Sequence, residues 1–156
     1  MTVQMVGNAA ILDLPKTAFL SSRKISPEAT LKCREWAGKM RDGGRCVITG
    51  AQSELEKEVF SILLAGSQPL ILVLARALWA EVPLYLQKAI GSGRLLAISP
   101  IKGFSTRVSK ETALARNRYI LQEAEEAVFG SLDPARSLAG LLRNFTGKPY
   151  SILEGA

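Results

Sequence analysis

Short apolar runs alternate with longer amphipathic segments along almost the whole chain. The runs are rich in Val, Ile, Leu and Phe and have the length of strands, roughly four to eight residues. The run "QPLILVLA" at 68–75 is apolar almost throughout, which is typical of a parallel strand buried on both faces. The predicted strands cover 16–22, 45–50, 68–75, 91–100 (with its leading turn), 127–130 and 148–153.

Helical spacing of apolar positions separates these strands. The first helix is predicted from Ser26, an N-cap residue followed by Pro27, to the glycines at 43–44. Its apolar stripe includes Cys33, which we therefore expect in the core. The second helix follows Ser53, which forms an S-x-x-E capping box with Glu56. Further helices are predicted at 82–90, 109–126 and 133–145.

Strands that alternate with helices predict βαβ units and an α/β fold class. We expect three layers: a Rossmann-like, doubly wound, mostly parallel sheet with helices on both faces. The 156 residues contain no internal repeat and no linker, so a single domain is predicted over 1–156. Residues 1–15 are interpreted as an N-terminal arm or a small extra element.

Composition and charge narrow the function. The net charge of +6 permits an anionic partner such as a nucleotide or nucleic acid. The chain has no histidine, which excludes nucleophiles that use a histidine base, and no convincing carboxylate pair is present. We therefore expect no catalytic residues, no metal and no cofactor. No apolar run has the roughly 18–20 residues of a membrane span, and no signal peptide is recognised, so a cytoplasmic protein is predicted.

The end of the first strand is a candidate anion site. Ser21, Ser22 and Arg23 lie between that strand and the next helix, where backbone N–H groups and the helix dipole favour an anion. Arg23 has the planar donor geometry that matches a phosphate. The alternative is an ordinary strand-to-helix turn with solvated charges.

The turn after the second strand is the next candidate. Gly50 permits a close approach of a ligand to the backbone, and Ala51, Gln52 and Ser53 lead into the following helix. Two helix N-termini on neighbouring strands make a better anion site than one. A well-capped helix without a ligand explains Ser53 equally well.

The sequence "LARNRYI" at 114–120 carries the third candidate. A helical wheel places Asn117 on the inward stripe, with Arg116 and Arg118 about 100° to either side. An inward amide needs hydrogen-bond partners, which a ligand or the neighbouring backbone could supply. Arg76 directly follows a buried strand and is a weaker candidate for the same crevice.

The order of these motifs resembles the Rossmann-like domain of the DNA-processing protein DprA (Smf), within the SLOG superfamily, over 17–153. The Arg116-Asn117-Arg118 run matches the Arg-Asn-Arg helix start of that family. The segment at 21–23 is similar to the family's Gly-Ser-Arg phosphate-contacting turn, and 49–53 is similar to its Ser-Gly-Gly-Ala turn before a helix. The segment at 129–132 is similar to its Ser-Gly-Ser-Leu turn, which adds Ser131. The His-containing segment of the family has no counterpart, and neither does the catalytic motif of the LOG hydrolases.

The resemblance implies a DprA-like, non-catalytic protein that binds single-stranded DNA in a basic crevice. A homodimer and a recombinase partner are further implications. The alternative is a SLOG-type sensor of a small nucleotide, or a protein that processes nucleoside phosphates, and a third reading is a scaffold that has lost its ligand. The residues predicted to bind phosphate or nucleic acid are Ser21, Ser22, Arg23, Gly50, Ala51, Gln52, Ser53, Arg76, Arg116, Asn117, Arg118 and Ser131.

Overall fold

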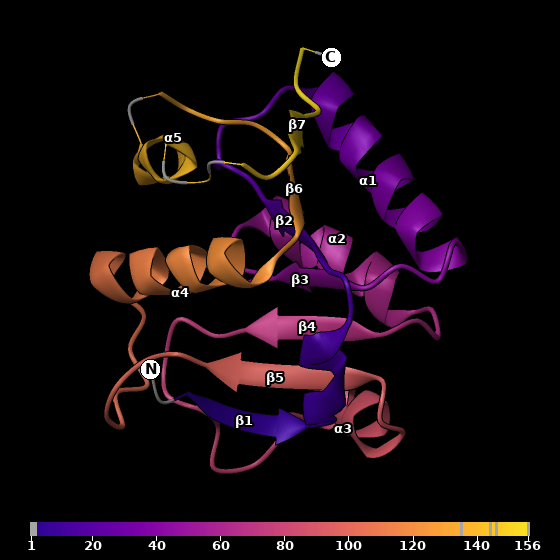
Figure 1. Cartoon of the computed structure of the whole chain (residues 1–156), viewed down its shortest axis with the longest axis vertical. Helices are drawn as coiled ribbons and strands as arrows, with labels where there is room; N and C mark the ends of the chain where they lie inside the picture. Colours follow the sequence, from indigo (N-terminus) through magenta and orange to yellow (C-terminus); the bar gives the residue numbers. More distant parts are fainter. Residues whose placement is uncertain (1–2, 135, 144, 146, 156) are drawn as a thin grey trace.

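One sheet runs through the protein, and helices cover both of its faces (Figure 1). The computed structural model describes residues 3–134, 136–143, 145 and 147–155. Within these ranges the sheet has seven strands in the order β1-β5-β4-β3-β2-β6-β7. The strands are β1 (Gln4–Gly7), β2 (Thr17–Leu20), β3 (Val47–Thr49), β4 (Leu70–Val73), β5 (Leu95–Ser99), β6 (Glu126–Phe129) and β7 (Tyr150–Ile152).

The strand order reverses beside β2. From β2 the chain proceeds through β3 and β4 to β5 in one direction, and β6 and β7 then pair on the other side. These pairings are parallel, and only β1 runs antiparallel, against β5. In register, Leu20 of β2 lies opposite Phe129 of β6, while Phe19 lies opposite Thr49 of β3. The turns after β2, β3 and β6 therefore begin at the same edge of the sheet, at its topological switch point.

The helices divide between the two faces. The first core cluster joins the α4 (Lys110–Glu123) and α5 (Ser137–Leu142) helices and the 3-10 helix η1 (Ala9–Asp13) to one face of the sheet. The second joins α1 (Pro27–Asp42), α2 (Glu54–Leu64) and α3 (Leu84–Gly91) to the other face. Side chains alternate between the faces along each strand, so Ala18 and Leu20 belong to the first cluster and Phe19 to the second. The predicted three-layer α/β fold is confirmed.

Local signals in the sequence account for several of the element boundaries. Ser26 caps α1 with Pro27 at its first position, and Ser53 and Glu56 form the predicted capping box at the start of α2. Cys33 is fully buried, as expected. None of the helices in the described part of the chain is both long and apolar enough to cross a membrane.

Residues 1–15, interpreted from the sequence as an arm or a small extra element, contribute strand β1 and the 3-10 helix η1. Strand β1 is too short and too exposed to show a clear period-two pattern. Two other segments differ from the sequence-based prediction. Helix α4 ends at Glu123 rather than at 126, because Glu126 already pairs with Thr17 in the sheet. Helix α5 is shorter than the predicted 133–145; residues 135 and 144 of that range lie outside the described residues.

Candidate functional site

Serine hydroxyls join the turns after β2 and β6 to each other. The backbone N–H of Ser131 donates to Ser21 Oγ at 3.1 Å, and Ser131 Oγ donates to the carbonyl of Lys24 at 2.8 Å. Ser22 Oγ accepts from the N–H of Asp133 at 2.9 Å. All three serines are buried. These hydrogen bonds hold the two turns together. The buried serines therefore have a structural role at the switch point.

Gly130 makes this close approach of the two turns sterically feasible. A Cβ at this position would lie 2.7 Å from Ser21 Oγ and 3.1 Å from the sulfur of Cys33. Both distances are shorter than ordinary van der Waals contacts, so a larger residue would push the turns apart. The glycine of the "FGSL" segment therefore has a packing role beside the hydrogen bonds of Ser131.

A buried carboxylate lies at the centre of the switch point. Glu56 is only 3% exposed, and its two oxygens accept hydrogen bonds from backbone N–H groups of two different turns. Oε2 accepts from Ser21 at 3.0 Å, and Oε1 accepts from Gln52 at 2.9 Å and from Ser53 at 3.1 Å. Three backbone donors at the carboxyl ends of β2 and β3 are thus directed at one anionic group.

A buried guanidinium crosses the turn after β3. The Nη1 of Arg116 donates to Gln52 Oε1 at 2.6 Å, while its Nε and Nη2 donate to Asn117 Oδ1 at 3.0 and 2.9 Å. A Cβ at Gly50 would lie 2.6 Å from Nε, so only a glycine leaves room for this side chain. Ala51 next to it has a positive φ of 47°.

The charge of Arg116 is desolvated, and no carboxylate among the described residues forms an ion pair with it. The side chain is 3% exposed, and within the described residues it makes no ion pair. Burial lowers the pKa of the guanidinium, and the nearby negative charge of Glu56 opposes that shift. A buried arginine normally has an acidic partner, because removing a lone charge from water is costly. In the part of the chain that the structure describes, the side-chain hydrogen bonds of Arg116 go to the amide oxygens of Gln52 and Asn117.

A cavity of about 610 Å³ opens over these groups. Its lining comes from the turns after β2, β3 and β6 and from the first turns of α4 and α5. Five of the lining residues are cationic: Arg23, Lys24, Lys110, Arg116 and Arg136. Two are acidic: Glu56, which the backbone N–H groups hold, and Asp133, whose carboxylate lies 3.9 Å from Arg136 Nε. The cavity therefore carries an excess of positive charge, with one cation buried and the others exposed at its rim.

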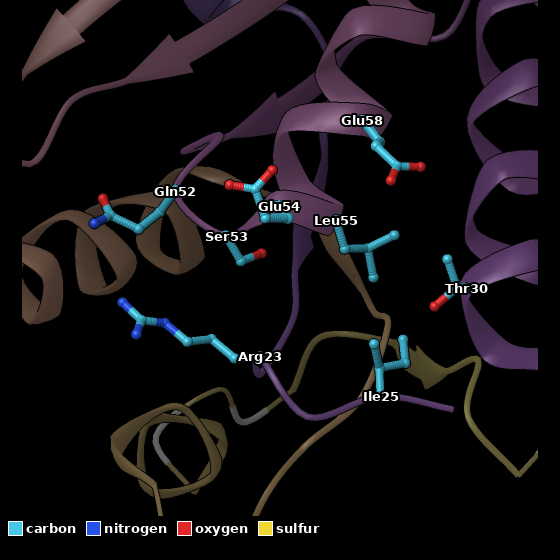
Figure 2. A pocket seen from close by; sticks show the side chains of 8 residues that line it. All are labelled: Arg23, Ile25, Thr30, Gln52, Ser53, Glu54, Leu55 and Glu58. Carbon is cyan, nitrogen blue, oxygen red and sulfur yellow. The ribbon is translucent and has the colours of Figure 1, made fainter. Parts of the chain in front are cut away.

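Arg23 also borders a second hollow, of about 500 Å³, between the N-terminal ends of α1 and α2. Figure 2 shows Arg23 and Gln52 on one side of this hollow, with Ile25, Leu55 and Thr30 on the other. The carboxylates of Glu54 and Glu58 complete the lining. Arg23 thus separates a cationic cavity from a smaller hollow with an apolar side.

The structure brings most of the predicted site residues to one place. Ser21, Ser22, Arg23, Gln52, Ser53, Arg116 and Asn117 all line the larger cavity. Gly50 and Ser131 lie behind its lining, where they position Arg116 and the β2 turn. Arg118 is exposed, and the Nε of Arg76 donates to the carbonyl of Ala77 at 2.9 Å; neither lines the cavity.

The helical wheel placed the wrong residue of α4 inward. Arg116 is buried, whereas Asn117 is only half-buried and accepts hydrogen bonds from Arg116. The wheel assumes one continuous face packed on the sheet, which holds for the later residues Ile120 and Ala124. At the start of α4 the inward face is set by the turn after β3, where Gly50 leaves room for a long side chain.

Sequence reasoning missed other parts of the cavity. Glu56 was recognised only as a capping residue, since nothing local indicates that Ser21 would reach it from 35 residues away. Lys110 and Arg136 were not singled out. The position of Lys110 two helical turns before Asn117 was an available signal, because residues seven apart share one face of a helix.

No family model and no curated protein sequence matches the chain, whereas solved structures do. DNA processing protein A from Helicobacter pylori, whose structure concerns its single-stranded DNA binding mode, superposes with a TM-score of 0.74 at 20% identity, over 96% of this chain and 70% of that one. DprA from Streptococcus pneumoniae superposes with a TM-score of 0.75 at 16% identity, over 96% of this chain and 54% of that one. The molybdenum cofactor binding protein from Rippkaea orientalis gives 0.59 at 13% identity, over 88% and 75%.

The chain has the Rossmann-like fold of these DprA and molybdenum cofactor carrier structures. It spans about half of the pneumococcal protein's length. Within this fold the switch point lies between β2 and β6, and the cationic cavity lies at that edge.

Proposed function

We propose that this chain is a DprA-like, non-catalytic protein that binds single-stranded nucleic acid in the cationic cavity at the carboxyl edge of its sheet. The observation that carries the proposal is Arg116: a buried guanidinium that lines a cavity and makes no ion pair with any residue that the structure describes. Glu56 is near but makes no ion pair with Arg116, so an anionic ligand would supply a direct partner, and the burial of Arg116 would strengthen that interaction.

The exposed cations favour a strand over a compact anion. Arg23, Lys24, Lys110 and Arg136 are distributed around the cavity rim on three different segments, so they are suited to successive phosphates of one backbone. Phe104, in the loop before α4, is 90% exposed and is available for stacking on a base. The Helicobacter pylori protein with the same fold binds single-stranded DNA, which supports the same class of ligand here.

Fluorescence anisotropy with a labelled single-stranded oligonucleotide tests the proposal. We expect saturable binding at low salt, with log K falling against log [salt] at a slope of roughly −3 if four to five phosphates are neutralised. Arg116→Met should weaken binding at least about tenfold, since it removes a charge-assisted contact. Lys88→Met is the matched control, because Lys88 is an exposed cation on α3 that does not line the cavity.

Absence of binding at low salt would refute the proposal. A saturable thermal stabilisation by a nucleoside phosphate, with no response to oligonucleotides, would instead support the small-nucleotide sensor. The cavity volume of about 610 Å³ suits a ligand of that size, so the two ligands are compared in one experiment.

The homodimer and the recombinase partner remain predictions from the DprA resemblance. Light scattering at several concentrations would report the oligomeric state. A recombinase-loading assay on single-stranded DNA would test the second point once DNA binding has been measured.

A further inference from the structure

The carboxylate of Glu56 accepts hydrogen bonds from backbone N–H groups of the kind that bind phosphates in other proteins. Backbone N–H groups at strand ends and helix N-termini form ready-made anion sites. Three of them, from Ser21, Gln52 and Ser53, donate to Glu56, and we call these three groups the N–H cradle. Glu56 also lines the cavity, so its carboxylate lies between the cradle and any ligand that enters.

A capping box explains only part of this arrangement. In a capping box the glutamate accepts from the N–H of the N-cap residue, here Ser53. Glu56 additionally accepts from Gln52 and, with its second oxygen, from Ser21 on the neighbouring strand. A surface cap is also solvated, whereas Glu56 is 3% exposed. The carboxylate of Glu56 thus accepts a hydrogen bond from each of the three N–H groups of the cradle, as a bound anion would.

We infer that Glu56 determines which ligand the cavity accepts, by filling the N–H cradle with a built-in anion. This inference rests on the proposed function and names its ligand class more closely. A compact phosphate cannot reach the backbone donors, and the charge of Glu56 repels a dianion from that position. The phosphates of a ligand would therefore bind the side chains of Arg116 and of the cations at the cavity rim. Such side-chain contacts are suited to the singly charged phosphodiesters of a nucleic-acid strand.

Two expected results distinguish this inference from a purely structural role of Glu56. Removal of the carboxylate should convert the cradle into a phosphate site, since its three donors then lack an acceptor. The wild-type protein should bind a 5′-phosphorylated oligonucleotide no more tightly than its 5′-hydroxyl counterpart, because a terminal dianion finds no place in the cradle.

Thermal unfolding in phosphate and in chloride at matched ionic strength tests the first expected result, with inorganic phosphate as the probe. We expect Glu56→Ala to melt lower than wild type in chloride and to gain about 3–6 °C, saturably, at phosphate concentrations near ten times its Kd. The melting temperatures of the wild type and of Glu54→Ala should change by equal amounts in phosphate, and neither change should saturate. Glu54 is the matched control because it lies in the same helical turn and its side chain is 93% exposed.

If Glu56→Ala does not fold, a phosphate titration of the wild-type protein followed by NMR provides the test. The signals to follow are the backbone amides of Ser21, Gln52 and Ser53. We expect phosphate to leave these signals unmoved, because Glu56 already holds the donors. Saturable movement of these signals in wild type, or a folded Glu56→Ala without a specific phosphate gain, would overturn the inference. If oligonucleotides do not bind but phosphate stabilises Glu56→Ala, the proposed function alone is refuted. If oligonucleotides bind but phosphate does not stabilise Glu56→Ala, this inference alone is refuted.

Discussion

Gly50 lies directly against the guanidinium of Arg116: a Cβ at residue 50 would be 2.6 Å from Arg116 Nε and 2.8 Å from its Cδ. The missing side chain of Gly50 is therefore what lets a buried arginine reach from α4 across the turn after β3. This contact joins two motifs that are far apart in the sequence, and its disruption should be felt at the cavity.

Gly50→Ala should displace Arg116 from Gln52. The backbone of Gly50 does not require positive φ, so the effect is steric. We expect a loss of about 1–3 kcal/mol in the free energy of unfolding and at least about tenfold weaker oligonucleotide binding. Gly38→Ala is the matched control: its Cβ would meet only the end of Arg41, and it should leave binding unchanged. Equal affinities for both variants would contradict this role of Gly50.

Arg116→Met should separate binding from stability. The substitution removes a buried charge that has no ion pair within the described residues, while a methionine fills a similar space. We expect oligonucleotide binding to fall while the free energy of unfolding, measured in urea, stays within about 1 kcal/mol of wild type or rises. A loss of about 3 kcal/mol or more in the free energy of unfolding would show that Arg116 stabilises the turn itself, and would contradict its assignment to ligand binding.

Ser131→Ala should loosen the turns at the switch point. It removes the buried hydroxyl that donates to the Lys24 carbonyl at 2.8 Å. The expected cost is about 1–2 kcal/mol in the free energy of unfolding, together with a smaller loss of binding than for Arg116→Met. Ser61→Ala on the exposed side of α2 should cost almost nothing, and an equal cost for both would argue against the proposed tie.

Lys148→Met should weaken the fold without affecting the cavity. The Nζ of Lys148 donates to the carbonyls of Leu121, Gln122 and Ala124 at 3.2, 3.0 and 2.8 Å, at the C-terminal end of α4. Loss of this cap should reduce the free energy of unfolding by about 1–2 kcal/mol. Oligonucleotide affinity should stay within about twofold, because the cavity is at the other end of the helix. A large loss of affinity would extend the binding surface to this region.

Alkaline pH should destabilise the protein through its two thiols. Burial raises the pKa of Cys33 and of Cys46 from 9.0 to about 11. The folded state therefore retains protons that the unfolded chain releases, so stability is complete below pH 9 and declines as pH rises toward 11. Urea unfolding at pH 8 and pH 10.5 should show this decline, and Cys33→Ala should reduce its steepness. An unchanged slope in that variant would contradict the assignment.

Sequence reasoning recovered the architecture because its signals are local. Apolar runs, helical spacing and caps such as Ser26 and Ser53 each depend on neighbours within one or two turns. Parallel strands then place the ends of β2, β3 and β6 at one edge, which is why the turns at 21–23 and 50–53 could be grouped in advance.

Contacts between distant segments were decided by tertiary packing alone. The helical wheel chose Asn117 over Arg116, because it could not include the space that Gly50 leaves in another turn. The capping box identified Glu56, yet its second oxygen binds Ser21 on a neighbouring strand. Local sequence patterns were enough to predict the layers, the sheet edge that carries the turns and the positive charge near that edge. Which cation is buried, and which anion accepts from the backbone donors, depends on atoms that come into contact only when the chain is folded.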